Sequence, residues 1–149
     1  MARALRETLA HTDDQTEIWY VAAPTPERTL LIEQGRVAIT MYDTEGVAGT
    51  SRTYGALTVG GIVRPGTSLR NVTAGQAGEY AVGVATDGTW TFDTITGATL
   101  ATRQGTPVYV IVATGVLTLT AGSNVRVGTV NYTANFAKVA GTLPIKIGA

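Results

Sequence analysis

Branched side chains and glycine dominate this sequence and limit what it can fold into. Thr, Val and Ile together supply 50 of the 149 residues, and Gly supplies 18 more. Branched side chains fit the pleated surface of a strand, whereas Gly allows the positive φ angles of tight turns. The composition therefore predicts an all-β domain of many short strands. A chain of this length can bury roughly 68–70% of its unfolded surface in one core.

Charge and cysteine content argue against several classes of function. The chain has 11 basic and 11 acidic residues, only 15% of its residues are charged, and it has no Cys. This balance favours neither nucleic acid nor a membrane surface as a partner, and without Cys there are no disulfides or thiolate metal sites. No apolar run approaches the roughly 18 residues that span a bilayer, and residues 1–10 lack the apolar stretch of a signal peptide. We expect a soluble chain that binds partners through shape and apolar contact.

The sequence divides into three stretches. Residues 1–16 are predicted to be a flexible N-terminal arm, because a helical turn at 4–9 is too short to be stable alone. Residues 17–56 are predicted to form extra N-terminal strands packed on the body, and residues 57–149 a small β-barrel domain. Residues 1–52 carry a net charge of −3 and residues 53–149 a net charge of +3. The two ends are therefore suited to different contacts.

Runs of branched and apolar residues between turn signals mark the strands. We expect strands at 18–21, 28–33, 36–42, 54–59, 68–73, 79–86, 89–95, 108–112, 116–120, 125–130, 135–140 and 143–148. The small polar stretch 44–51 is predicted to be a loop. Asp87 and Gly88 predict a tight hairpin between two of these strands, followed by Trp90 and Phe92 on a buried face with Thr89, Thr91 and Asp93 on a solvent face.

Two stretches are apolar on both faces, which bears on the oligomeric state. These are residues 108–112, which we expect to form a central strand, and residues 143–148. A small monomer does not easily bury both faces of such strands. They therefore predict a homotrimer whose contacts come mainly from the barrel.

The residues offer little for metal binding. The single His, His11, stands near Asp13 and Asp14 in the predicted arm, but the spacing lacks the ligand pattern and glycine turn of a calcium loop. An acidic cluster of this kind is usually a solvated surface. We therefore predict no metal and no cofactor.

Catalysis is equally poorly supported. Ser51, Ser68 and Ser123 lie in no nucleophile motif and have no His nearby in sequence. Asp87 and Asp93 flank two aromatic residues, as paired carboxylates do in sugar sites. Each also has a structural reason, because Asp suits a turn before Gly and the solvent face of a strand. We predict that the chain is not an enzyme and has no catalytic residue.

A carbohydrate- or surface-binding β module is an open alternative. Such a module would stack its ligand on Trp90 or on the pair Trp19 and Tyr20. Stacking platforms need exposed aromatic rings, and the same residues fit core positions equally well. Sequence alone leaves both readings of these aromatics open.

Four segments of the second half share a pattern of small and branched residues. They are 78–93 (GEYAVGVATDGTWTFD), 103–110 (RQGTPVYV), 125–130 (VRVGTV) and 143–147 (LPIKI). Together they resemble the small capsid decoration (cement) proteins of tailed phages, over residues 57–149. The chain departs from that family in having some 50 residues before the barrel, and in Gln104, where the family commonly has Ala before the Gly.

The resemblance implies a fold and a function. It implies a β-barrel or β-tulip domain that forms a homotrimer on the outer surface of the virion capsid, at three-fold or quasi-three-fold positions. There it would clamp neighbouring subunits of the major capsid protein, with no catalytic residues and no cofactor. We expect the arm and the strand after it to supply the capsid-binding residues, for which the candidates are Arg3, Arg6, His11, Asp13, Asp14, Trp19 and Tyr20.

Overall fold

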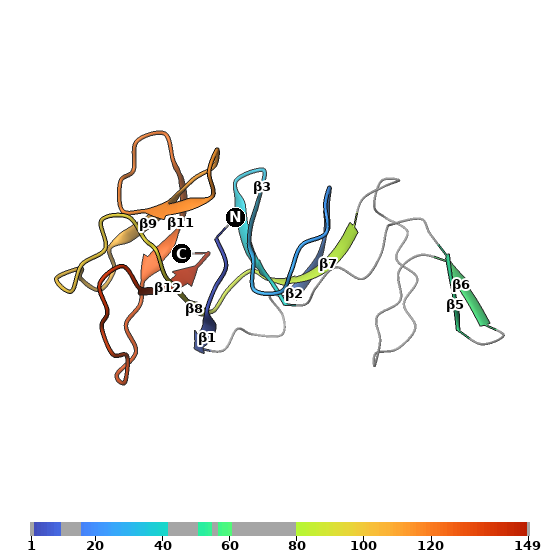
Figure 1. Cartoon of the computed structure of the whole chain (residues 1–149), viewed down its shortest axis with the longest axis horizontal. Helices are drawn as coiled ribbons and strands as arrows, with labels where there is room; N and C mark the ends of the chain where they lie inside the picture. Colours follow the sequence, from blue (N-terminus) through green and yellow to red (C-terminus); the bar gives the residue numbers. More distant parts are fainter. Residues whose placement is uncertain (1, 10–15, 42–50, 55–56, 61–79, 149) are drawn as a thin grey trace. The chain divides into compact units, whose positions relative to one another are not determined.

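The chain is built of β-strands. The computed structural model describes residues 2–9, 16–41, 51–54, 57–60 and 80–148, and these residues form strands, turns and no helix. The predicted all-β class is confirmed. The strands, labelled in Figure 1, are β1 (Arg6–Leu9), β2 (Thr16–Val21), β3 (Leu30–Glu33), β4 (Arg36–Thr40), β5 (Ser51–Tyr54), β6 (Leu57–Gly60), β7 (Tyr80–Ala85), β8 (Thr89–Phe92), β9 (Pro107–Ile111), β10 (Val116–Thr118), β11 (Val125–Val130) and β12 (Leu143–Ile147).

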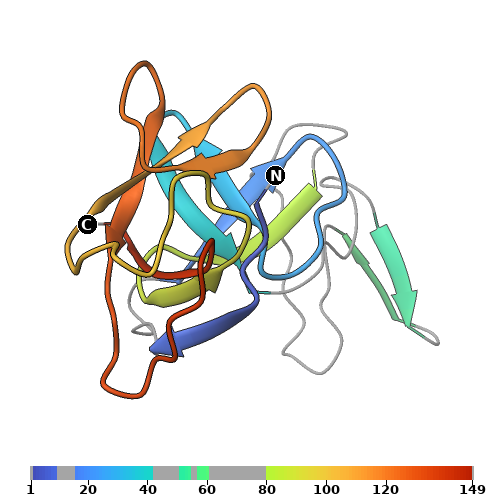
Figure 2. The ribbon, with the colours of Figure 1, turned by 60° about the vertical axis from the view of Figure 1, so that its left-hand side comes forward.

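Hydrogen bonds join the strands into two larger sheets and one hairpin. The six-stranded sheet has the order β1-β8-β12-β11-β9-β10, the four-stranded sheet has the order β2-β7-β4-β3, and β5 pairs with β6. Both larger sheets curl as half-barrels. The loop of residues 131–142, red-orange in Figure 2, projects from the six-stranded sheet between β11 and β12.

The chain clusters into two compact units, each assembled from separate stretches. The first unit consists of Met1–Thr16, Arg28–Ile39 and Ala85–Ala149, and the second of Glu17–Glu27 and Thr40–Val84. These bounds differ from the predicted division at residues 16 and 56. Strand pairing joins segments far apart in sequence, so boundaries drawn along the chain do not follow the clusters.

The core of the first unit lies on the six-stranded sheet. Phe92, Val108, Leu143, Ile145 and Ile147 are at most 1% exposed. Burying each such side chain contributes roughly 1.5–3 kcal/mol. The apolar face of 143–148 is therefore covered within one chain, so this stretch gives no support to a trimer contact.

Strand β8 is buried on both faces. Its four residues, from Thr89 to Phe92, are each at most 3% exposed. The predicted solvent face is therefore wrong for Thr89 and Thr91, although Asp93, just after the strand, is exposed. Both edges of β8 are paired, to β1 and to β12. Threonine can be buried at such a position because its hydroxyl can form a hydrogen bond inside the core. At Thr89, Asn131 Nδ2 donates to the hydroxyl Oγ1 at 2.8 Å.

The N-terminal segment is part of the sheet. Ala4 N–H donates to the Arg28 carbonyl at 2.7 Å, and Leu5 N–H donates to the Thr91 carbonyl at 2.6 Å. Strand β1 then pairs antiparallel with β8, and Ala4 is only 3% exposed. The prediction of a free arm, or of a helical turn, is therefore wrong for residues 2–9, while residues 10–15 lie outside the described part. Main-chain pairing at a sheet edge needs no alternating side-chain pattern, which is why the sequence did not reveal it.

Two further strand predictions differ from the structure. Asp87 and Gly88 do not form a hairpin, because β7 and β8 belong to different sheets; Gly88, with φ of 91°, turns the chain from one sheet to the other. Residues 135–140 form a loop with one isolated bridge, Val139 to Thr142, in place of a strand. The expected strand 54–59 is split between β5 and β6, and the expected strand 68–73 and most of loop 44–51 lie outside the described residues.

Candidate functional site

The seven predicted capsid-binding residues are described only in part. Arg3 is exposed, Tyr20 is half-buried and Trp19 is only 6% exposed. Arg6 lies in β1 without a described side chain, and His11, Asp13 and Asp14 lie outside the described residues. Trp19 is therefore a packing residue, and its indole Nε1–H donates to Glu17 Oε2 at 2.9 Å.

The second tryptophan is also a core residue. Trp90 is 3% exposed, and its Nε1–H donates to the Asp87 carbonyl at 2.9 Å. A sugar ring needs an open aromatic face, and neither indole offers one. The carbohydrate-binding alternative therefore loses both of its tryptophan platforms, and only the half-buried Tyr20 of the predicted pair remains.

The described part of the chain bears on the sequence predictions for metal binding, membrane crossing and paired carboxylates. Within it, no group of three His, Asp or Glu side chains is placed to hold a metal ion. The same described ranges hold no helix of the length and apolarity that would cross a membrane. Asp93 lines a pocket to which Asp87 does not contribute. The two carboxylates are therefore not brought together as a pair at that pocket.

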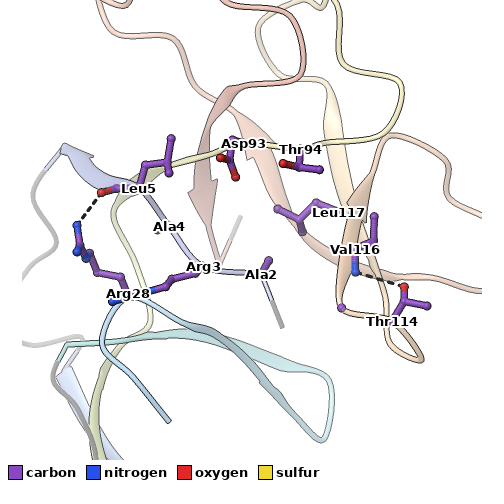
Figure 3. A pocket seen from close by; sticks show the side chains of 11 residues that line it. Ala2, Arg3, Ala4, Leu5, Arg28, Asp93, Thr94, Thr114, Val116 and Leu117 are labelled. Atoms are coloured by element: carbon purple, nitrogen blue, oxygen red, sulfur yellow. Dashed lines mark hydrogen bonds between the residues drawn. The ribbon is translucent and has the colours of Figure 1, made fainter.

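The pocket lies beside the N-terminal segment, within the first unit. It has a volume of about 450 Å³. Its lining comes from residues 2–5, from Arg28, from 93–94 after β8, and from 114–117 at the start of β10. Figure 3 shows Arg3 and Arg28 at one end, with Asp93 and Thr94 on another wall. The pocket thus holds positive and negative side chains at different places.

Local backbone geometry fixes two of the lining residues. Arg28 and Thr94 have backbone φ angles of 60° and 55°, which residues other than Gly rarely adopt. Arg28 Nη1 donates to the Leu5 carbonyl at 2.7 Å, and this bond anchors the guanidinium at the rim of the pocket. The sequence marks Arg3 and Asp93 as candidate functional residues but not Arg28 or Thr94. No local motif marks them, because the pocket joins segments far apart in sequence.

A group of side-chain contacts holds the loop 131–142 to residues 102–104, which precede β9. Gln104 Nε2 donates to Asn131 Oδ1 at 2.9 Å, and Gln104 Oε1 accepts the Tyr132 N–H at 2.6 Å. Lys138 Nζ stands 4.4 Å from the centroid of the Tyr132 ring. Burial raises the pKa of the Tyr132 phenol, which donates to the Thr102 carbonyl at 3.1 Å. Gln104, the departure from the decoration-protein pattern, thus bridges two neighbouring residues of the loop.

An apolar surface is left exposed on the β9–β10 hairpin. Val112 is 61% exposed and Val116 is 39% exposed. Ile111 lies opposite Val116 in the register of the two strands and is half-buried. Strand β9 lies between β11 and β10, as expected for a central strand. On its other face, Tyr109 and Ile111 are half-buried in the single chain.

Comparison with known proteins does not assign the chain to a family. No family model, no curated protein and no solved structure matches it.

Proposed function

We propose that the chain is a capsid decoration protein. It binds the outer surface of a tailed-phage head as a homotrimer and stabilises the lattice of the major capsid protein. The observation that carries the proposal is the sequence resemblance, whose four segments correspond to β7–β8, β9, β11 and β12. Strands β8, β12, β11 and β9 are consecutive neighbours in the six-stranded sheet. Apart from β7, which belongs to the four-stranded sheet, the resembling segments are therefore neighbouring strands of one sheet.

The exposed side chains of the β9–β10 hairpin support a trimer contact. Val112, 61% exposed, follows the last residue of β9, and Val116, 39% exposed, is the first residue of β10. Covering exposed apolar side chains removes them from water, and association between copies is one way to do so. We assign the trimer contact to this hairpin and not to β12, whose apolar residues are already buried.

Light scattering tests the trimer at micromolar concentration. The wild-type chain is expected to have three times its monomer mass of 15.5 kDa. Val112→Asp should dissociate the trimer, because a carboxylate at a buried apolar contact is strongly unfavourable. The matched control is Val139→Asp, since Val139 is similarly exposed at 58% but lies in the loop 131–142.

Two results would contradict the proposal. One is a wild-type species of 15.5 kDa, above all if its melting temperature rises on addition of a sugar, as the binding-module alternative predicts. The other is an equal loss of mass in Val112→Asp and Val139→Asp, which would separate trimer formation from the β9–β10 hairpin.

A further inference from the structure

Two loops of the first unit are joined into one surface, which we call the loop platform. They are residues 95–104, between β8 and β9, and residues 131–142, between β11 and β12. Ile95 N–H donates to the Gly141 carbonyl at 3.0 Å, and Gly141 N–H donates to the Ala98 carbonyl at 3.1 Å. The side-chain bonds described above add further links between the loops. Each loop therefore holds the other in place.

The loop platform presents two large aliphatic side chains to solvent. Leu100 is 60% exposed and Val139 is 58% exposed. A hydrogen bond from Thr102 N–H to the Thr99 carbonyl at 3.1 Å closes the turn that carries Leu100. A second bond, from Thr142 N–H to the Val139 carbonyl at 3.1 Å, closes the turn that begins at Val139. Both turns are thus ordered before a partner arrives, which lowers the conformational cost of covering these side chains.

The charge of the loop platform is entirely positive. Its two loops contain no Asp or Glu, and Arg103 and Lys138 are exposed in them. The absence of acidic residues extends over 94–149, a stretch with four basic residues and no acidic one. An anionic partner is therefore attracted here without being repelled by a carboxylate of the same stretch.

Contact with an aromatic ring positions one of the two charges. Lys138 Nζ stands 4.4 Å from the centroid of the Tyr132 ring. The half-buried Phe136 ring packs against Tyr132, with 5.7 Å between the two centroids. A ring face attracts a cation but carries no net charge that would neutralise it. The ammonium is therefore held in place and keeps its positive charge for a partner.

We propose that the loop platform binds an acidic segment of another protein chain, one with aliphatic side chains between its carboxylates. The carboxylates face Arg103 and Lys138, and the aliphatic side chains cover Leu100 and Val139. These aliphatic residues lie outside the β9–β10 hairpin, so the surface is separate from the trimer contact. The inference goes beyond the decoration function and does not rest on it, because the chemistry of the segment decides the binding whichever protein presents it.

Titration of the full-length protein with three blocked pentapeptides tests the proposal. The first is acetyl-Asp-Leu-Asp-Leu-Asp-amide, which has both features. Acetyl-Asn-Leu-Asn-Leu-Asn-amide lacks the charges, and acetyl-Asp-Ser-Asp-Ser-Asp-amide lacks the aliphatic side chains. Amide NMR shifts are followed at Ala101, Arg103 and Val139. The first peptide should produce saturable shifts there and bind at least about tenfold more tightly than either of the others, a difference of about 1.4 kcal/mol.

Two variants separate the charged contact from the apolar one. Lys138→Gln should weaken binding of the first peptide at least about threefold, whereas Lys138→Arg keeps the charge and should keep the affinity. The matched control is Lys146→Gln, which removes the same charge from an exposed position on β12 and should leave the affinity unchanged. Leu100→Ala should weaken binding of the first peptide and leave binding of the serine peptide unchanged.

Several outcomes would overturn the proposal. One is equal affinity for the aspartate and asparagine peptides. Another is equal affinity for the leucine and serine peptides, which would reduce the effect to general attraction between charges. A loss of affinity in Lys146→Gln as large as that in Lys138→Gln, or shifts that map away from the two loops, would also contradict it. If Lys138→Gln does not fold, the three peptides and Leu100→Ala still decide the matter.

Discussion

The main chain of Lys146 lies so close to Gly128 that no other side chain fits there. A Cβ at Gly128 would stand 2.9 Å from the Lys146 carbonyl carbon and closer still to its oxygen. The two residues lie on the neighbouring strands β12 and β11, beside the irregular step between Arg126 and Gly128 in the β9–β11 ladder. The opposing atoms belong to the backbone and cannot rotate away. This contact sets the close approach of two central strands.

Gly128→Ala is therefore expected to destabilise the fold by about 3 kcal/mol, the upper end of the usual cost of overpacking. Urea denaturation measures the change. The control is Gly105→Ala, because Gly105 has no atom within 4 Å of its added Cβ and tests only the cost of its φ of 78°. That cost is about 1–2 kcal/mol. A smaller loss of stability in Gly128→Ala than in Gly105→Ala would contradict the close approach.

Trp90→Ala is expected to lower the free energy of unfolding by about 3–5 kcal/mol, as for other large core residues. The reason is the burial of the indole, which is 3% exposed and hydrogen bonded to the Asp87 carbonyl. Leu100→Ala, at a side chain 60% exposed, is the control and should change stability by less than about 0.5 kcal/mol. A Trp90→Ala protein that melts within a degree or two of the wild type would show that the indole does not pack in the core.

Deletion of residues 1–9 should lower the melting temperature. The deletion removes strand β1, the buried Ala4 and the main-chain bonds of Ala4 and Leu5 to Arg28 and Thr91. Each such bond contributes about 1 kcal/mol. Differential scanning calorimetry measures the effect. The matched variant His11→Ala/Asp13→Asn/Asp14→Asn keeps the strand and should melt like the wild type. An unchanged melting temperature after the deletion would restore the picture of a free arm.

Tyr132 should make the protein sensitive to alkaline pH. Burial raises the pKa of this phenol in the folded state, so the neutral form is favoured there. The corresponding stability is fully present below the ordinary tyrosine pKa of about 10 and is lost as the pH rises through the folded value. The absorbance difference at 295 nm between wild type and Tyr132→Phe should titrate above about pH 10, and the wild type should lose melting temperature more steeply there. A midpoint at or below pH 10 would contradict this.

The sequence predicts the strand content well, because local pattern and strand pairing agree over most of the second half. Strands β7, β8, β9, β11 and β12 lie close to their expected bounds. Which strands pair with one another is harder to predict from the sequence. Asp87-Gly88 suits a hairpin and a corner between sheets equally, since both need the positive φ that Gly supplies. Only the pairing of β8 with β1 and β12 distinguishes the two.

The candidate site was harder to predict than the fold. Arg3 and Asp93 were noted for their charge, but their meeting at one pocket depends on the pairing of residues 2–9 with β8. That pairing uses main-chain groups, which every sequence provides. For Trp90, the sequence allowed both a core position and an exposed stacking platform, and the structure buries the indole.

Cryo-electron microscopy of expanded phage heads incubated with the protein tests the central claim most directly. In the proposed function, the heads are built from the major capsid protein whose lattice the chain would stabilise. We predict three copies of the chain on the outer surface at each three-fold or quasi-three-fold position. The variant His11→Ala/Asp13→Asn/Asp14→Asn should need at least about tenfold more protein for equal occupancy, about 1.4 kcal/mol per site. Heads that stay bare at saturating wild-type protein would contradict the decoration function.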